Sequence, residues 1–529
     1  MRIGEAALIA VLAAAVVVLL VPAHRIRSPR SSVVLLGGTL GAVALALGVQ
    51  LVVEHPRVQL VPAYAVAVGV LGMLVVRLVR ARRAAADPLV SAGRQGPGRG
   101  APARRTSARA AGGTLGRAVE DAPGRIVGGR LGRVVGAGLA VGLLAASAVA
   151  AVVLPVWSMP TPTGDYAIGS VDLEFDDPDR PETHTADPDD TRRVMTTVWY
   201  PVDPDDAEGL TPQPYPSELG AAVSSVFGLP DALFSHAELV STHVVSGAEV
   251  ALEADAYPVI LFSPGVLSTR FQSMAMVEEL VSRGFVVVGI DHPYTSGEVE
   301  FPDGSTAAAV DDITDTGSTT EEEYAYNVSE VGIRVADVSF VLDRLTALND
   351  DDPTGLLQGR LDLESVGIAG HSFGGATAVQ ALSVDERIDV GLSLEGGFWG
   401  SVTSTGLTKP FAYLASEATA EAFRTKDVAA GYTPELDADL RATLGTSTAE
   451  LDAAVIDSFI HQSFTDLALV SPSLFAGGMD PAHNVDITRT QASWFFEKHL
   501  HGDDSGDFGT DSPAYPEVEF ADEPGALFG

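Results

Sequence analysis

Four apolar runs within the first 154 residues constrain this chain more than any other feature of its sequence. Each run is free of internal charge and has close to the roughly 17 to 25 residues that a helix needs to cross a hydrocarbon core. We therefore predict four transmembrane helices. The runs extend over Ala6–Val21, Val33–Val53, Val58–Val76 and Val134–Leu154.

The first run has an alternative interpretation as the core of a secretory signal peptide, because Arg2 precedes it. No convincing A-x-A-like cleavage site follows before Arg25, however, and three further apolar runs come after it. The sequence therefore favours three membrane helices within residues 1–80 and a fourth within residues 134–154.

The charge of the chain changes sign near Pro155. The segment up to Leu154 carries 18 Arg against 5 acidic residues, a net charge of +13, so the remainder must carry −50 to give the net charge of −37. Nucleic acid phosphates and anionic lipid headgroups repel so acidic a segment. We expect no nucleic acid partner for residues 155–529.

The loop Arg77–Arg133 holds 13 Arg against 3 acidic residues and is rich in Gly, Ala and Pro. This composition is typical of disorder, and basic loops between membrane helices stay on the cytoplasmic side. We expect residues 81–133 to form a basic cytoplasmic linker, with anionic inner-leaflet lipids as an alternative contact for its Arg side chains. Four spans then place both termini, and residues 155–529, on the extracytoplasmic side.

The chain contains no cysteine, which excludes disulfides, thiolate metal sites and a cysteine nucleophile. Three Asp-rich runs indicate a solvated acidic surface, with a calcium site as the alternative interpretation. No EF-hand spacing supports calcium, so we expect neither a metal ion nor another cofactor. The runs are Asp176–Asp179, Asp187–Asp190 and Asp350–Asp352.

Short apolar strands alternate with helical patterns in the acidic segment, which predicts a doubly wound, mostly parallel α/β sheet. Several strands are continuous apolar runs, as expected where helices bury both faces of a sheet. Strands are predicted at Val194–Tyr200, Val259–Phe262, Phe285–Ile290, Val366–Ala369, Val390–Leu394 and Phe411–Leu414. Helices are predicted at Met274–Arg283, Val331–Leu348, Ala376–Leu382 and near Thr488–Leu500.

The residues Gly370–Gly375, with the sequence GHSFGG, match the G-x-S-x-G nucleophile elbow. The motif is weak alone, but a strand-like run precedes it and the helix-like run Ala376–Leu382 follows it. A serine in such a turn sits at a helix N-terminus, which favours developing negative charge. We therefore predict that Ser372 is the nucleophile of a carboxylic ester hydrolase. The alternative is a Gly-rich turn with an incidental serine.

A serine hydroxyl needs a general base, which follows the nucleophile in this kind of chain. His499 and His501 end a helical pattern, and His483 lies in a loop-like stretch. His461 follows a short apolar stretch, and the pattern favours it as the base over a buried packing role.

Two glutamates are candidates for the acid that orients the base. Glu395 directly follows the strand Val390–Leu394, and Glu417 follows the strand Phe411–Leu414. The second position is the more usual one in this fold, and each residue could instead be a solvent-exposed glutamate. The pattern of the residues leaves the choice open.

Four stretches of the acidic segment, in the same order, resemble the plasma-type (isoform II) platelet-activating factor acetylhydrolases. This resemblance implies the α/β-hydrolase fold over roughly residues 194–500 and does not extend to the four apolar runs. The stretches are Tyr257–Gly265 (YPVILFSPG), Gly370–Thr377 (GHSFGGAT), His461–Asp466 (HQSFTD) and Ser493–Leu500 (SWFFEKHL).

The resemblance also assigns roles to particular residues. It implies Glu395 as the triad acid in place of Glu417, His461 as the base, and the amides of Phe373 and Val266 as oxyanion donors. The family usually has Asp where Glu395 stands and His where Pro264 stands, so the acid and the oxyanion loop depart from the family pattern. Phospholipids with short or oxidised acyl chains are the implied substrates.

Other interpretations remain open at the level of sequence. A broad carboxylesterase or a polyester hydrolase would use the same triad, and a catalytically silent membrane receptor or scaffold could keep the fold. The apolar segment Ala221–Phe234 is a candidate lid or acyl-binding wall near the bilayer, with an ordinary amphipathic core helix as its alternative.

Overall fold

The computed structural model describes residues 1–21, 28–86, 130–310, 320–524 and 527. The chain divides into two compact units, Met1–Pro155 and Val156–Gly529. Most of the predicted basic linker lies outside the described residues. Its two ends are helical, because the helix before it continues to Ala86 and the helix after it begins at Arg130.

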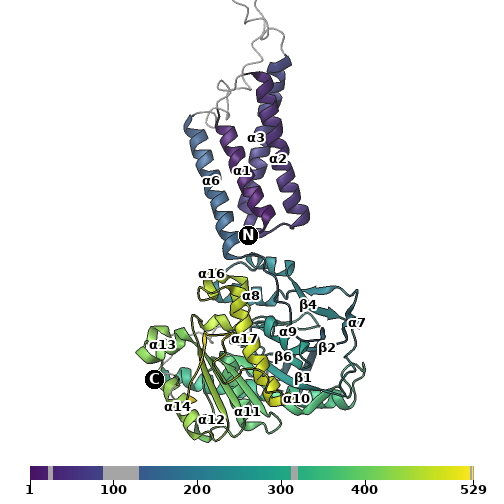
Figure 1. Ribbon diagram of the computed structural model, residues 1–529, viewed down its shortest axis with the longest axis vertical. Helices are drawn as coiled ribbons and strands as arrows, with labels where there is room; N and C mark the ends of the chain where they lie inside the picture. Colours follow the sequence, from purple (N-terminus) through teal and green to yellow (C-terminus); the bar gives the residue numbers. More distant parts are fainter. Residues whose placement is uncertain (22–27, 87–129, 311–319, 525–526, 528–529) are drawn as a thin grey trace, which may run out of the picture. The chain divides into compact units, whose positions relative to one another are not determined.

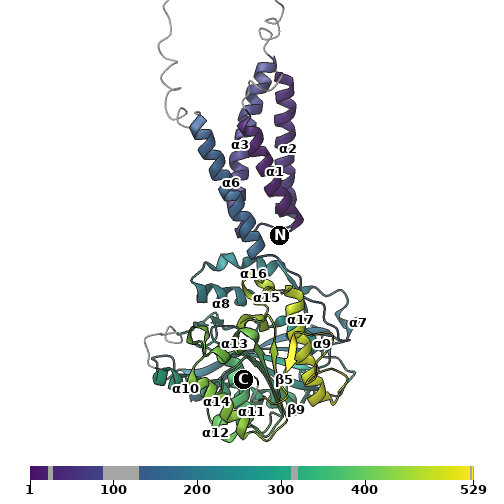
Figure 2. The same ribbon diagram turned by 60° about the vertical axis from the view of Figure 1, so that its left-hand side comes forward.

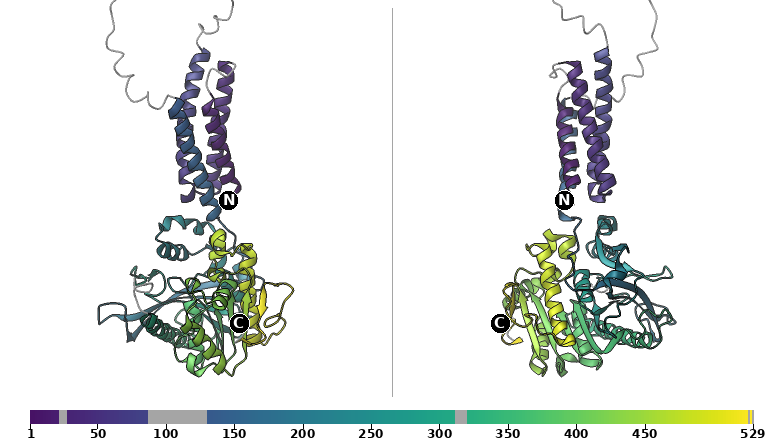
Figure 3. Two further views of the ribbon diagram at one scale, coloured as in Figure 1. Left: turned by 90° about the vertical axis from the view of Figure 1, so that its left-hand side faces the viewer. Right: turned by 45° about the vertical axis from the view of Figure 1, so that its right-hand side comes forward.

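The described part of the N-terminal unit contains four long helices, which lie side by side in both views of Figure 3. All four are long and apolar enough to cross a membrane. Leu and Val side chains pack between them, whereas other large apolar side chains point outward, as expected for helices in lipid. The helices are α1 (Ile3–Leu20), α2 (Pro29–Val53), α3 (Val61–Ala86), preceded by the short η2 (Val58–Leu60), and α6 (Arg130–Val153).

Polar contacts join the start of α1 to the link between α2 and α3. The buried side chains of Glu5 and Arg57 form an ion pair. The Gly4 amide donates to the Glu54 carboxylate over 2.7 Å, and Arg2 donates to the Glu54 carbonyl over 3.0 Å. The N-terminus and this link therefore lie at the same end of the helix bundle.

The second unit is built on an eleven-stranded sheet in the order β13-β12-β11-β10-β9-β5-β6-β2-β1-β4-β3. Strands β12 to β6 along this order run parallel, and β2 and β13 add antiparallel neighbours. The strands are β1 (Ala167–Pro181), β2 (Thr191–Val202), β3 (Pro212–Pro214), β4 (Ser241–Ser246), β5 (Tyr257–Ser263), β6 (Val286–Asp291), β9 (Leu361–His371), β10 (Val390–Leu394), β11 (Phe411–Ser416), β12 (Leu451–Ile456) and β13 (Val518–Phe520), with β7 (Val299–Glu300) and β8 (Thr306–Ala307) forming a separate hairpin.

Helices cover both faces of the sheet. α9 (Met274–Ser282) and α17 (Pro481–Phe496) pack together on one face, and α10 (Thr320–Asp350) and α11 (Phe373–Val384) on the other, as Figures 1 and 2 show. Every residue of β5 and β6 is buried as a result, which explains their continuous apolar sequences.

Shorter helices complete the unit. They are α7 (Pro204–Ala207), α8 (Glu218–Phe227), η3 (Asp231–Leu233), η4 (Ser235–Leu239), α12 (Val402–Thr405), α13 (Glu417–Thr425), η6 (Val428–Ala430), α14 (Pro434–Thr446), η7 (His461–Phe464), α15 (Leu467–Val470), α16 (Pro472–Phe475) and the π-turn η8 (Glu497–His501).

The predicted α/β fold is confirmed, and each predicted strand overlaps an observed one. Among the strands that the prediction missed are β1, which carries many charged residues, and β12, and both lie away from the apolar centre of the sheet. The predicted loop position of His483 is wrong, because Asp480 caps α17 and His483 lies in the first turn of that helix.

Candidate active site

Ser372 occupies a strained turn between β9 and α11. Its backbone has φ 57° and ψ −122°, a conformation that non-glycine residues rarely adopt, and its amide donates to the Leu394 carbonyl over 2.9 Å. A Cβ at Gly370 would lie 2.0 Å from the Gly374 carbonyl oxygen, and a Cβ at Gly374 1.9 Å from that of Ser263. Only glycine fits at both positions, so the motif folds as a tight strand-to-helix turn.

A cavity of about 280 Å³ opens beside this turn. Its wall contains Ser372 and Glu395 together with both residues predicted to donate to an oxyanion. The lining residues are Val266, Thr295, Tyr326, Asn327, Glu330, Ser372, Phe373, Glu395, Gly397, Trp399 and Leu436. Residues from the ends of four strands therefore meet around the serine.

His461 is paired with the buried carboxylate of Glu395. The distance from His461 Nδ1 to Glu395 Oε1 is 2.6 Å, and Thr419 Oγ1 and the Ser416 amide also donate to this carboxylate. Burial alone would lower the pKa of His461, but the adjacent carboxylate outweighs it and the pKa is raised. The His461 side chain is 38% exposed and that of Glu395 only 3%. The imidazole is therefore accessible to solvent, while the carboxylate that holds it is buried.

His371 ties the loop of His461 to the elbow. The Nε2–H of His371 donates to the His461 carbonyl over 2.9 Å, and the two ring centroids are 4.7 Å apart. Burial, and then the neighbouring His461, lower the pKa of His371 to about 3, so its ring is neutral. Among the described residues no direct hydrogen bond joins Ser372 Oγ to His461, a contact that in hydrolases often forms only when substrate binds.

Within the described residues no backbone acceptor engages the amides of Phe373 and Val266, two residues that line the cavity. Phe373 begins α11, so its amide has no helical acceptor four residues earlier. The two neighbours of Val266 are engaged, because the Gly265 amide donates to Gln272 Oε1 and the Leu267 amide to the Thr295 carbonyl, each over 2.9 Å. The amide between them remains for a ligand.

The structure does not bring the rival acid or the other histidines to this cavity. Glu417 is exposed and accepts a hydrogen bond from the Ser458 amide over 2.8 Å. His483 pairs with Glu517 at 3.0 Å, and the ring of His501 packs on Phe285.

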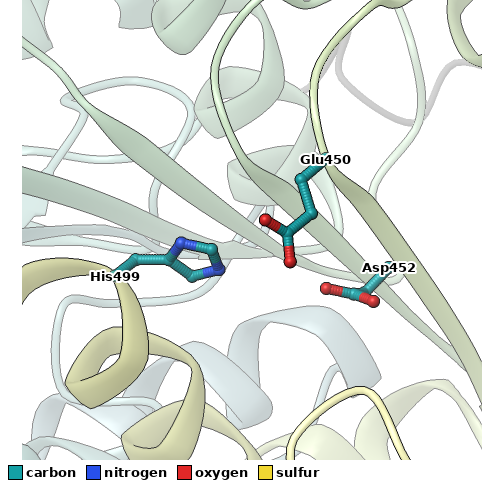
Figure 4. Close-up of side chains that lie close together, drawn as sticks. All are labelled: Glu450, Asp452 and His499. Carbon is teal, nitrogen blue, oxygen red and sulfur yellow. The ribbon is translucent and has the colours of Figure 1, made fainter. Parts of the chain in front are cut away.

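His499 belongs to a separate group with Glu450 and Asp452, whose potential ligand atoms lie within 4.8 Å of one another (Figure 4). Lys498 already neutralises Glu450 through a 2.7 Å ion pair, and Glu450 is exposed. The ammonium group would compete with a cation there, and none of these residues lines the cavity beside Ser372.

A second Ser–His–acid arrangement, which the sequence did not reveal, consists of Ser263, His292 and Asp337. Ser263 Oγ is 2.9 Å from His292 Nε2, and His292 Nδ1 is 2.9 Å from Asp337 Oδ2. All three residues are 0% exposed, and burial lowers the pKa of His292 to about 4. No substrate can reach this serine, so the arrangement is structural. The only sequence signal was the position of Ser263 and His292 at the ends of adjacent strands.

The segment Ala221–Phe234, predicted as a lid or acyl-binding wall, contributes no residue to the wall of this cavity within the described chain. Ala222, Val223 and Phe234 are buried in their own unit, as in an ordinary amphipathic helix. Residues of α10, Trp399 and Leu436 line the cavity instead, so the structure does not support an acyl-binding wall in this segment, and its role as a lid stays a prediction.

Comparisons with known proteins agree with this geometry. Residues 153–511 match the family model described as platelet-activating factor acetylhydrolase, isoform II. A probable 1-alkyl-2-acetylglycerophosphocholine esterase of Arthroderma benhamiae is 25% identical over 73% of this chain and 99% of its own length. The platelet-activating factor acetylhydrolase of Cavia porcellus is 25% identical over 46% of this chain and 58% of its own length.

A solved structure extends the comparison to the fold. The ferulic acid esterase from Streptomyces cinnamoneus has 28% sequence identity and a TM-score of 0.56 over 69% of this chain and 99% of its own. Because the family model spans most of the chain and the fold agrees, this chain belongs to the isoform II platelet-activating factor acetylhydrolase family of esterases, within the α/β-hydrolase fold.

Proposed function

We propose that this chain is a membrane-anchored serine esterase in which Ser372 is the nucleophile, His461 the general base and Glu395 the acid that orients it. The observation that carries the proposal is the 2.6 Å contact between Glu395 and His461. The backbone of His461 is in turn hydrogen-bonded to His371, the neighbour of Ser372 in the elbow. Glu395 and Ser372 line the same cavity.

The mechanism follows from these positions. His461 takes the proton of Ser372 as its oxygen attacks the ester carbonyl, and the Glu395 carboxylate stabilises the resulting imidazolium. The amides of Phe373 and Val266 donate to the oxyanion, and removing one such donor costs about 3 to 4 kcal/mol. The imidazolium then protonates the leaving alcohol, and a water molecule activated by His461 releases the acid from Ser372.

We propose phospholipids with short or oxidised acyl chains as substrates. The cavity is at the small end of the range for ligand sites, which is roughly 300 to 1,000 Å³, and favours a short acyl group. Phe373, Trp399 and Leu436 supply its apolar wall, and Asn327 and Glu330 supply polar groups.

Aromatic acyl esters are a second candidate class. The rings of Phe373 and Trp399 lie 5.3 Å apart in the cavity wall and could stack on a planar acyl group. The similarity to the ferulic acid esterase makes the same suggestion.

A panel of esters tests these alternatives on the purified full-length chain in detergent. We expect covalent labelling by a fluorophosphonate and kcat/KM highest for acetyl and butyryl esters, with a fall for longer chains. A higher kcat/KM for methyl ferulate would favour the second class. An unlabelled chain without activity on any ester would support a silent receptor or scaffold and reject the proposed function.

We also propose that the four apolar helices anchor the chain in a membrane with residues 155–529 outside the cytoplasm. The ion pair of Glu5 with Arg57 supports the fourfold crossing, because it holds the N-terminus and the α2–α3 link at one end of the bundle. Protease added to intact cells stripped of any outer wall should digest the acidic unit. Digestion only after lysis would contradict the outward orientation.

A further inference from the structure

Arg334 is a fully buried cation beneath the catalytic cavity. It lies on α10 and its side chain donates three hydrogen bonds to the loops that follow β5 and β6. Its Nη1 donates to the Pro264 carbonyl over 2.7 Å. Its Nε donates to the Thr295 hydroxyl and its Nη2 to the Thr295 carbonyl, both over 3.0 Å.

The same guanidinium lies over the ring of Phe373, with its Cζ 4.9 Å from the ring centroid. Pro264 precedes Val266 by two residues. On the other side of Val266, the Thr295 carbonyl accepts a hydrogen bond from the Leu267 amide. Arg334 therefore contacts both segments whose amides would bind the oxyanion.

Arg334 differs from the neighbouring buried arginine in how its charge is compensated. Arg192 is paired with the carboxylates of Asp337 and Glu182, at 2.7 and 2.8 Å. Within the described residues no carboxylate forms an ion pair with Arg334. Burial lowers the pKa of Arg334 to about 10, which leaves it charged at neutral pH. Its hydrogen bonds go to carbonyl and hydroxyl oxygens of the two loops, while Asp337 and Glu330 stabilise its charge without a direct ion pair.

We propose that Arg334 is a positioning residue that fixes the Pro264–Val266 loop and Phe373 so that their two amides converge on the oxyanion. This inference rests on the proposed function. A planar guanidinium can bind two loops at once, whereas a lysine ammonium is a point donor. Misplacing a catalytic group by about 1 Å can cost on the order of 100-fold in rate.

Arg334→Lys, with Arg192→Lys as the matched buried control, tests this role in the full-length chain. We expect Arg334→Lys to lower kcat by roughly 10- to 100-fold with KM changed by less than about threefold. The inhibition constant of a trifluoromethyl ketone, whose adduct carries an oxyanion, should rise in parallel. Arg192→Lys should keep kcat within about twofold even if its melting temperature falls.

A milder pair covers the case in which Arg334→Lys does not fold. Thr295→Val keeps the shape of the side chain but removes the hydroxyl that accepts from Arg334, whereas Thr295→Ser keeps that acceptor. We expect Thr295→Val to lower kcat by about 3- to 10-fold and Thr295→Ser to stay closer to the parent enzyme.

The outcomes separate this inference from the proposed function. Suppose that the parent is active and labelled, and that folded Arg334→Lys keeps its kcat and inhibitor affinity. This result would reject the role of Arg334 but not the proposed function. Where Arg334→Lys does not fold, unchanged values in Thr295→Val would reject the role in the same way. Equal losses of kcat in Arg334→Lys and Arg192→Lys reject it as well, since a general loss of packing would then suffice. A parent that neither hydrolyses esters nor reacts with a fluorophosphonate rejects both proposals.

Discussion

The domain contains two Ser–His–acid arrangements, and the one with the better hydrogen bonds is not the candidate catalyst. Ser263, His292 and Asp337 are joined by two 2.9 Å contacts but are sealed in the core. Ser372 has a strained backbone, lies at a helix N-terminus and lines a cavity. We infer from the difference that hydrogen-bond geometry alone does not identify a nucleophile, and that access to a cavity and a helix N-terminus favour Ser372 as the candidate.

The largest expected effect separates the two serines. Ser372→Ala should lower kcat for a soluble ester by about 10⁴-fold or more, because it removes the nucleophile. Ser263→Ala should keep kcat within a few-fold and lower the stability by about 1 to 3 kcal/mol, since His292 loses a buried partner. Initial rates and thermal unfolding of both variants measure this. A large fall in kcat in a folded Ser263→Ala variant would contradict the purely structural role of Ser263.

The two glutamates provide the next comparison. Glu395→Gln should lower kcat by about 10³- to 10⁴-fold, because the amide cannot stabilise the imidazolium of His461. Glu417→Gln should change kcat by less than about twofold, since its exposed carboxylate touches only a backbone amide. Steady-state kinetics on one ester would decide, and the reverse ranking would overturn the assignment of the acid.

The pH dependence of kcat/KM should report the protonation of His461. His461 must be neutral to accept a proton, and Glu395 raises its pKa above the ordinary value near 6.5. We therefore expect kcat/KM to fall about tenfold per pH unit below that raised pKa. In a pH–rate profile, an acidic limb with its midpoint below about 6 would contradict the pairing seen here.

His292 and His461 should change the stability of the fold in opposite directions as the pH falls. Unfolded His292 binds a proton near pH 6.5 and the folded residue only near about 4, so stability falls as pH drops through this window. The contribution of the His461 pair is present below about pH 6.5 and is lost as pH rises through the folded pKa. Melting temperatures between pH 4 and 9 check the His292 effect. A melting temperature that stays constant from pH 6.5 to 4 would argue against a buried neutral His292.

The smallest expected effect concerns His371, which ties the two halves of the candidate site. His371→Phe should lower kcat by about tenfold, because the loop of His461 loses its hydrogen bond to the elbow. His371→Gln, which keeps a donor, should recover part of that loss. Kinetics of the two variants measure the difference, and equal activity in both would show that the bond to the His461 carbonyl is unimportant.

The sequence predicted the central sheet and Ser372 because both depend on local patterns. Continuous apolar strands mark the parallel sheet, and the steric needs of the elbow restrict Gly370 and Gly374 to glycine. The choice of His461 was also favoured by pattern, although its partner was not. Glu395 and Glu417 both follow strands, and only packing shows that the first is buried against His461 while the second faces solvent.

The buried polar residues could not be predicted from the sequence. Arg192, Arg334 and Asp337 look like surface residues in the sequence, because charged side chains are rarely buried, yet each is nearly or fully buried. Their partners lie far away in the chain, as for Arg192 and Asp337, which are 145 residues apart. Long-range pairs of this kind leave no periodic signal.

Identifying the peptide that a fluorophosphonate modifies tests the central claim most directly. The account predicts one adduct, on Ser372, formed in the full-length chain, abolished by Ser372→Ala and retained by Ser263→Ala. An adduct on another serine, or undiminished labelling of the Ser372→Ala variant, would contradict it.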